Sequence, residues 1–162
     1  MLAMALSCRP QLIIADEPTT AVDVTVQAQL LELLCALTVS QRVALLLITH
    51  NLGVVAKYAN RVNVMYAGRI VERAPTDELF AAPRHPYTKA LLHCIPRLDR
   101  DRKEGARLDP IQGAPPDLVR RPPGCAFHPR CANVKASCLE VWPELVEVSP
   151  GHSVACCDSE CK

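Results

Sequence analysis

The chain has 162 residues, a formal net charge of +1 and 4% aromatic residues. So small a charge gives no electrostatic reason to expect nucleic acid as the main partner, and so few aromatics argue against a surface on which bases stack. No apolar run approaches the roughly 20 residues that a membrane-spanning helix needs, and the first ten residues lack the basic lead of a secretory signal.

The first third of the sequence alternates between helical and strand patterns. Residues 1–9 are expected to end a helix, and residues 12–15 form an uncharged apolar run, typical of a strand buried on both faces of a parallel sheet. Residues 24–37 carry apolar side chains at helical spacing, with Asp23 or Thr25 as the cap, and residues 43–48 form a second apolar strand. Two such strands separated by a helix predict a βαβ unit and an α/β fold.

The next elements are shorter. Asn51 can cap a helix that runs to about residue 58, and residues 61–66 and 69–72 alternate in the way that predicts a hairpin. Helices are expected from residue 76 and from Pro86, because proline suits the first helical position. Residues 97–124 are charged and then proline-rich, which indicates a linker.

Two adjacent carboxylates, Asp16 and Glu17, follow the first apolar strand and precede Pro18. Open α/β sheets bind their ligands at the carboxyl ends of their strands. A carboxylate there can hold Mg²⁺ through water, and the next acid can orient and deprotonate a water molecule for phosphoryl transfer. Taken alone, the pair is equally compatible with a solvated strand end.

The residues that follow carry a resemblance to a known family. Residues 18–23, Pro-Thr-Thr-Ala-Val-Asp, closely resemble the segment that joins the Walker B strand to the D-loop in ATP-binding-cassette (ABC) ATPases. His50 closes the second apolar strand, where that family places its switch histidine. The chain, from near Met1 to about Cys157, therefore resembles the ATP-binding subunit of an oligopeptide/dipeptide ABC importer.

The resemblance implies a role for each of these residues. Asp16 would be the Walker B carboxylate that holds Mg²⁺ of Mg-ATP through water, and Glu17 the general base for the attacking water. His50 would contact the γ-phosphate, and Asp23 would be the D-loop acid at the dimer interface. Without the resemblance, His50 reads as a structural histidine at a strand end and Asp23 as a helix cap.

It also implies a fold and a division of the chain. We expect a partial P-loop NTPase (ABC ATPase) core with parallel strands in residues 1–82, and a helix and proline-rich linker in residues 83–124. A small, irregular, cysteine-rich extension follows in residues 125–162. Residues 84–89, Arg-His-Pro-Tyr-Thr-Lys, are typical of this subfamily, but nothing in their chemistry suggests catalysis.

Two departures from the family pattern stand out. Asn51 occupies a position where the family commonly has an acid, and asparagine caps a helix about as well. No G-x-x-x-x-G-K-[ST] phosphate loop and no glycine-rich signature occur in the 162 residues. We therefore expect the carboxyl-terminal part of such an ATPase, a fragment or a truncated reading frame, which by itself neither binds ATP tightly nor hydrolyses it.

Nine cysteines are many for this length, and they gather towards the end of the chain. Four thiolates from loops, at Cys125, Cys131, Cys138 and Cys156, can hold an iron–sulfur cluster or a Zn²⁺ ion, although their spacing matches neither a C-x₂-C nor a ferredoxin pattern. The alternative is a set of buried thiols that pack a small tail.

The resemblance bears on this set too. Residues 127–131 and 147–156 resemble the carboxyl-terminal extension of peptide-importer ATPases, some of which carry a [4Fe–4S] cluster on these cysteines. His128 and His152 lie nearby in the sequence as substitute ligands or as groups that orient the ligands.

The function implied by the resemblance is ATP hydrolysis coupled to inward movement of peptides. The partners would be a second ABC ATPase subunit, two membrane permease subunits and, indirectly, an extracytoplasmic peptide-binding protein, with no nucleic acid. The subunit would be peripheral at the cytoplasmic face of the inner membrane. The alternative is a non-catalytic metal-binding or regulatory module that uses the cysteine-rich tail.

Overall fold

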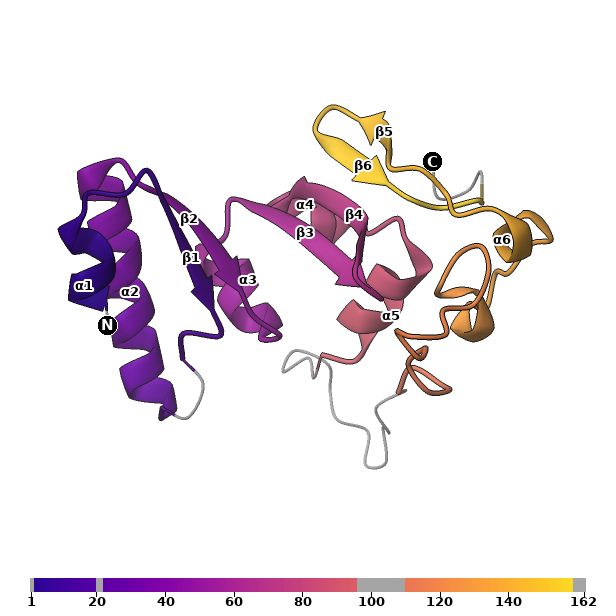
Figure 1. The fold of residues 1–162 in the computed structure, drawn as a ribbon, viewed down its shortest axis with the longest axis horizontal. Helices are drawn as coiled ribbons and strands as arrows, with labels where there is room; N and C mark the ends of the chain where they lie inside the picture. The colour runs from indigo at the N-terminus through magenta and orange to yellow at the C-terminus, as the bar shows by residue number, and fades with distance from the viewer. Residues whose placement is uncertain (1, 20–21, 96–109, 159–162) are drawn as a thin grey trace. The chain divides into compact units, whose positions relative to one another are not determined.

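The computed structural model describes residues 2–19, 22–95 and 110–158 (Figure 1). The chain divides into two compact units, Met1–Ala59 and Asn60–Lys162, which are described separately below. The predicted boundaries of residues 1–82, 83–124 and 125–162 follow the family resemblance, whereas the two units follow the packing of the chain. The predicted division therefore stays a prediction. Within the described ranges, none of the helices has the length and apolar character needed to traverse a bilayer.

The first unit is a βαβ arrangement with two further helices. Its elements are α1 (Leu2–Ser7), β1 (Leu12–Asp16), α2 (Val24–Gln41), β2 (Ala44–Ile48) and α3 (Leu52–Tyr58) (Figure 1). Strands β1 and β2 are parallel, with Leu12 opposite Ala44 and Asp16 opposite Ile48. The predicted βαβ unit is therefore confirmed, with α2 as the crossover.

The sheet of this unit is buried on one face only. Along β1, Ile13 is buried whereas Leu12 and Ile14 are exposed, and β2 alternates in the same way, with Leu46 and Ile48 exposed. The prediction of a strand buried on both faces is thus wrong for these residues. The physical reason is that the described sheet has two strands, and the outward-pointing residues of both lie on a face that none of the unit's described elements covers.

Helix α2 packs through a narrow stripe. Leu31, Leu34 and Thr38 are buried and recur at a spacing of three to four residues, so they lie on one side of the helix. The helix contacts β2, and it ends at Arg42, which adopts the left-handed conformation and donates its N–H to the carbonyls of Thr38 and Val39.

The second unit contains a four-stranded antiparallel sheet in the order β3-β4-β6-β5. Strands β3 (Arg61–Tyr66) and β4 (Arg69–Pro75) form the predicted hairpin. Its turn residues, Ala67 and Gly68, have φ values of 49° and 78°, as a type I′ turn requires. The predicted helices α4 (Thr76–Ala81) and α5 (Pro86–His93) follow.

The cysteine-rich extension is more regular than predicted. It contains a 3₁₀ turn η1 (His128–Arg130), helix α6 (Ser137–Glu140) and a hairpin of β5 (Val146–Ser149) and β6 (His152–Val154). Strand β6 pairs with β4, so the extension completes the sheet that the earlier hairpin begins. These strands escaped prediction because three or four residues are too few to show an alternating pattern.

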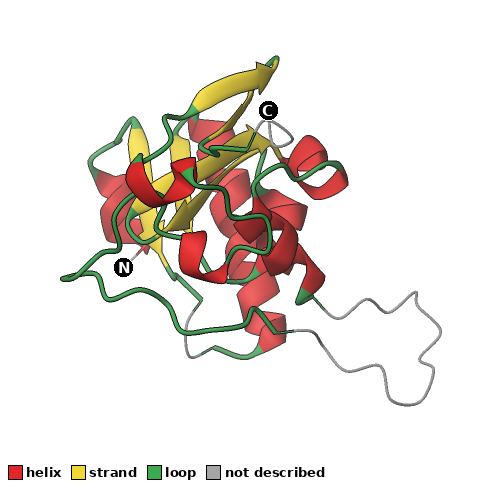
Figure 2. Ribbon diagram, turned by 90° about the vertical axis from the view of Figure 1, so that its right-hand side faces the viewer, coloured by secondary structure: helices red, strands yellow, loops and turns green. Residues whose placement is uncertain are grey.

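The second unit also contains the described part of the predicted linker and a hydrophobic core. Residues 96–109 of the linker lie outside the described residues, and residues 110–127 form loops and turns (Figure 2). The hydrophobic core joins the two ends of the unit, because Tyr66, Val71 and Leu79 pack with Ala126 and Phe127. The rings of Tyr66 and Phe127 meet edge to face, with 5.2 Å between their centroids.

Candidate functional site

The structure brings Glu17 and His50 together at one edge of the first unit's sheet. Because β1 and β2 are parallel and Asp16 lies opposite Ile48, the carboxyl ends of the two strands meet at the same edge. Glu17 follows β1 directly, and His50 comes two residues after β2. The Oε1 atom of Glu17 lies 2.8 Å from Nδ1 of His50. The two residues, 33 positions apart in sequence, are hydrogen-bonded side chain to side chain.

The backbone of Glu17 is held in an unusual conformation. Its φ is +42°, in the left-handed region that side-chain-bearing residues rarely adopt. Its N–H donates to the carbonyl of Ile48 at 2.9 Å, so a hydrogen bond ties the end of β1 to the end of β2. Such strain costs about 1–3 kcal/mol and concentrates at functional sites.

Stability does not explain the contact between Glu17 and His50. The side chain of His50 is 82% exposed and that of Glu17 44% exposed. Exposed ion pairs contribute only about 0–1 kcal/mol, and this one is an ion pair only when the imidazole is protonated. A solvent-accessible carboxylate held by an imidazole is, however, a suitable arrangement for taking a proton from a water molecule.

Asp16 and Asp23 are the other two predicted site residues of the first unit. The last residue of β1 is Asp16, which is exposed at the same sheet edge. Asp23 is the N-cap of α2 and accepts hydrogen bonds from the N–H groups of Thr25 and Val26 at 3.0 and 2.9 Å. Its expected role at a dimer interface stays a prediction.

The residue after His50 caps the next helix. Asn51 accepts from the N–H groups of Gly53 and Val54 at 3.0 and 3.3 Å, which fixes the start of α3 directly behind His50. This is the capping role expected for asparagine in place of an acid.

The four cysteines predicted to act as metal ligands lie near one another in the second unit. Cys125 precedes η1, Cys131 ends it, Cys138 lies in α6 and Cys156 follows β6. The N–H of Cys125 donates to the carbonyl of Cys138 at 2.8 Å. Burial, and then the proximity of Cys138, Cys156 and Cys131, raises the pKa of the Cys125 thiol.

A fifth thiol, Cys157, joins this group and was missing from the predicted ligand set. Burial and the neighbouring Cys138 raise the pKa of Cys157 to about 11. The sulfur of Cys157 lies 3.8 and 3.7 Å from the carbonyl oxygens of Ser137 and Val141, on either side of Cys138. The signal that could have found it is its position directly after Cys156.

The cysteine group suits a thiophilic metal by its donor type. Its arrangement gives no such support, because no three His, Cys, Asp or Glu side chains in the described ranges are placed to hold a metal ion. The predicted iron–sulfur cluster or zinc ion is therefore not supported by the geometry.

The segment Arg84–Lys89 has a structural role that the sequence did not reveal. His85 is 1% exposed and caps α5, because its Nδ1 accepts from the N–H of Tyr87 at 3.1 Å. Burial lowers the pKa of His85 to about 4, so the imidazole is neutral at pH 7. Tyr87 stacks in a tilted geometry on Tyr66, at a centroid distance of 4.6 Å.

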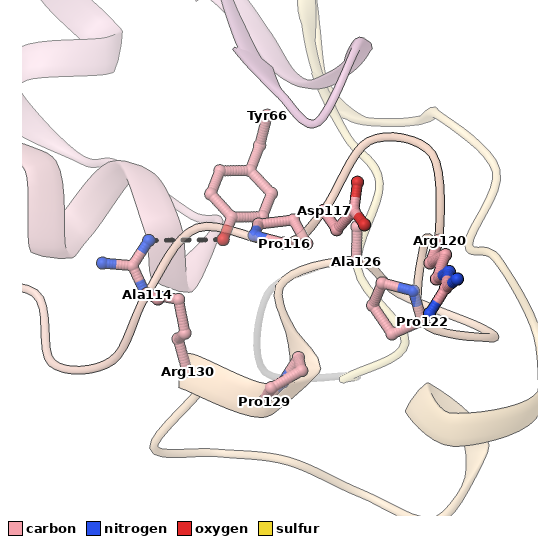
Figure 3. Close-up of a pocket in the computed structure, with 9 residues that line it drawn as sticks. All are labelled: Tyr66, Ala114, Pro116, Asp117, Arg120, Pro122, Ala126, Pro129 and Arg130. Atoms are coloured by element: carbon pink, nitrogen blue, oxygen red, sulfur yellow. Dashed lines mark hydrogen bonds between the residues drawn. The ribbon is translucent and has the colours of Figure 1, made fainter.

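A small pocket of about 210 Å³ lies in the second unit (Figure 3). Arg130 shapes one side of it by donating to the carbonyls of Gln112 and Ile111 at 2.9 Å and to the hydroxyl of Tyr66 at 3.3 Å. The guanidinium thus fastens the linker segment to the hairpin. The lining is mostly apolar, and it consists of Tyr66, Ala114, Pro116, Asp117, Arg120, Pro122, Ala126, Pro129 and Arg130.

The chain matches one known family over part of its length and several curated proteins over nearly all of it. Residues 71–138 match the family described as the oligopeptide/dipeptide transporter, C-terminal region. Over 156 residues, 96% of the chain, it is 51% identical to the dipeptide transport ATP-binding protein DppD of Bacillus subtilis, of which the match covers 46%. It is 50% identical over 160 residues to the oligopeptide transport ATP-binding protein OppD of Mycobacterium tuberculosis, of which 26% is covered.

A third relative, a probable peptide ABC transporter ATP-binding protein of Sinorhizobium fredii, is 52% identical over 156 residues, with 46% of it covered. The chain thus spans about half the length, or less, of the curated relatives that it matches. The resemblance expected from the sequence is confirmed by these matches: the chain is similar to the carboxyl-terminal part of ATP-binding proteins of oligopeptide and dipeptide transporters.

Proposed function

We propose that the chain supplies residues that hydrolyse ATP in the ATP-binding subunit of a peptide ABC importer. The observation that carries this proposal is the 2.8 Å contact between Glu17 and His50 at the carboxyl ends of two parallel strands. The strained backbone of Glu17 supports it, because a left-handed glutamate held against the neighbouring strand positions the carboxylate at the sheet edge.

Each side chain has a distinct task in this proposal. Glu17 takes the proton from the water that attacks the terminal phosphate of ATP, and His50 orients that carboxylate and lies on the phosphate side. Asp16, next to Glu17, would hold Mg²⁺ through water, and the ion would neutralise charge that develops on the phosphates. Asp23 fixes α2 and would face a second ATPase subunit.

The remaining assignments are those that the family resemblance implies. The protein would have a P-loop NTPase core, pair with a second ATP-binding subunit, and act beneath two membrane permeases that receive peptides from a binding protein. It would be peripheral at the cytoplasmic side of the membrane. Because no phosphate-loop motif occurs in the 162 residues, we do not expect them to hydrolyse ATP on their own.

A chimera tests the proposal. Residues 1–162 replace the matching part of the dipeptide transport ATP-binding protein of Bacillus subtilis, to which they are 51% identical. We expect the chimera to hydrolyse ATP and the Glu17→Gln variant to lose about 10²–10⁴-fold in rate, the contribution of a general base.

The control uses another exposed ion pair of the first unit. Glu32 lies 3.0 Å from Lys57 between α2 and α3, away from the strand ends. Glu32→Gln should leave the rate of the chimera within about twofold of the unmodified chimera, because exposed pairs contribute little. Equal rates in the Glu17→Gln and Glu32→Gln chimeras would contradict the role given to Glu17.

A second, metal-binding candidate rests on the donor type and the closeness of the thiols, not on a formed ligand set. We propose that Cys125, Cys131, Cys138 and Cys156 hold a [4Fe–4S] cluster, or alternatively zinc, with the side chains moving from the positions described here. The test is iron, sulfide and zinc analysis of protein prepared without oxygen. A four-cysteine site predicts one cluster or one zinc ion per chain and its loss in Cys138→Ser, whereas metal-free protein would contradict it.

A further inference from the structure

The second unit buries a histidine between two carboxylates. His152, in β6, is fully buried. Its Nε2 lies 2.7 Å from Oε1 of Glu72 in β4, and its Nδ1 lies 2.9 Å from Oε1 of Glu78 in α4. The three residues come from three different elements, and His152 is separated from Glu72 by 80 positions in sequence.

The geometry assigns the protons. A carboxylate oxygen accepts a hydrogen bond, and a neutral imidazole has only one N–H to donate. Both contacts of His152 are made at once only if both ring nitrogens carry a proton, so that the ring is an imidazolium. A neutral ring would leave one nitrogen lone pair against a carboxylate oxygen, which is repulsive in a buried site.

Both carboxylates also accept hydrogen bonds from donors other than His152. Glu72 accepts from the backbone N–H groups of Arg84 and His85, at 2.7 and 3.0 Å, with one oxygen each. Glu78 also accepts from the hydroxyl of Ser149 at 2.7 Å. This hydroxyl, followed by His152, lowers the pKa of Glu78. Both acids are therefore supplied with donors that stabilise a negative charge.

We propose that His152, protonated at both ring nitrogens, holds the hairpin β5–β6 to strand β4 and helix α4 through two charged hydrogen bonds. The backbone attachment of the hairpin is short, because β6 pairs with β4 only at Glu72–Val154 and Arg73–Ser153. The imidazolium adds two charged hydrogen bonds to this small contact, and such bonds are about twice as strong as neutral ones. Beyond β6, the N–H of Ala155 donates to the carbonyl of Val71 at 2.8 Å, and Cys156 follows directly.

Two acidic side chains face His152 from two different elements. Glu72 faces it from β4 and Glu78 from α4, with Arg84 acting on Glu78. The turn between β5 and β6 is held separately, since Arg61 of β3 donates to the carbonyl of Gly151 at 2.8 Å and Glu147 accepts from its N–H. The contacts of His152 are therefore distinct from those that hold the turn of the hairpin.

The first test needs no variant. In the full chain labelled with ¹⁵N-histidine, the ring nitrogens of His152 should both show the chemical shifts of protonated nitrogens at pH 7.5. His85, which accepts a hydrogen bond at Nδ1, provides the neutral single-tautomer signal for comparison in the same spectrum. A single-tautomer spectrum for His152 would overturn the proposal.

The second test measures how much these charged hydrogen bonds stabilise the attachment of the hairpin. Glu78→Gln removes one charge and keeps an oxygen of similar shape, and Asp77→Asn, at an exposed neighbouring position of α4, is its matched control. Hydrogen exchange of the β6 amides, at one pH, should become about 10- to 100-fold faster in Glu78→Gln and stay unchanged in Asp77→Asn. Equal hydrogen-exchange rates in the two variants would show that the charged hydrogen bonds of His152 do not hold the hairpin.

Discussion

The burial of His85 makes a quantitative prediction about acid sensitivity. His85 is neutral in the fold, because burial lowers its pKa from 6.5 to about 4. The unfolded chain therefore binds this proton more readily than the folded chain below pH 6.5. The contribution of a neutral His85 to stability is complete above pH 6.5 and is lost as the pH falls towards 4.

The expected change in unfolding free energy follows from the lowered pKa of His85. A difference of 2.5 pKa units, from 6.5 to about 4, corresponds to about 3 kcal/mol of unfolding free energy at roughly 1.4 kcal/mol per unit. The side chain is 1% exposed, so solvent screening reduces this only slightly. Because the whole stability of a domain is about 5–15 kcal/mol, the effect is measurable.

The assay compares the wild-type chain with His85→Asn by urea unfolding from pH 7.5 to pH 4. Asparagine keeps a helix cap but does not titrate in this range. The fluorescence of Trp142, the single tryptophan, reports on the second unit. Other groups titrate in both chains, so the quantity of interest is the difference in unfolding free energy between them.

We expect this difference to shift by about 3 kcal/mol against the wild type between pH 7 and pH 4. His93→Asn, an exposed position at the end of the same helix, should follow the wild-type curve closely. A difference between wild type and His85→Asn that stays constant over the whole range would refute the reasoning.

Three further substitutions, one of them with a matched control, test the local arguments about the fold. Asp23→Ala should cost about 1 kcal/mol by removing the cap of α2, seen as faster hydrogen exchange in the helix's first turn. Gly124→Ala should cost at least about 2 kcal/mol in urea unfolding, because a Cβ there would lie 2.3 Å from the carbonyl oxygen of Cys138 at a φ of +66°. Leu34→Ala should cost about 2–5 kcal/mol and Leu33→Ala, at an exposed position, under about 0.5 kcal/mol, as measured by thermal melting.

Local sequence signals predicted the elements that hold the candidate site. The apolar runs of β1 and β2 stop at Asp16 and Thr49, so the ends of the strands, and with them the meeting of Glu17 and His50, could be inferred. The hydrophobic periodicity of the sequence could not give the number of strands that lie beside β1 and β2. The outward face, with Ile14 61% exposed, is apolar and uncovered in the first unit for that reason.

Long-range pairings were the features that escaped prediction. Nothing near Glu72 in the sequence announces that His152, 80 residues later, will lie against it, because the contact depends on how β6 joins the sheet. His85 was visible only as part of a family marker, and its cap and burial depend on the fold of both ends of the second unit. The cysteines were found by count and spacing, which do not specify their mutual distances.

The most direct measurement for the hydrolytic site is a double-mutant cycle on the ATP hydrolysis rate of the chimera with Bacillus subtilis DppD. Glu17→Gln, His50→Gln and the double variant are compared with the unmodified chimera. If the 2.8 Å contact makes the two side chains one catalytic unit, the double variant should be about as slow as Glu17→Gln alone. A double variant whose loss is the product of the two single losses would contradict it.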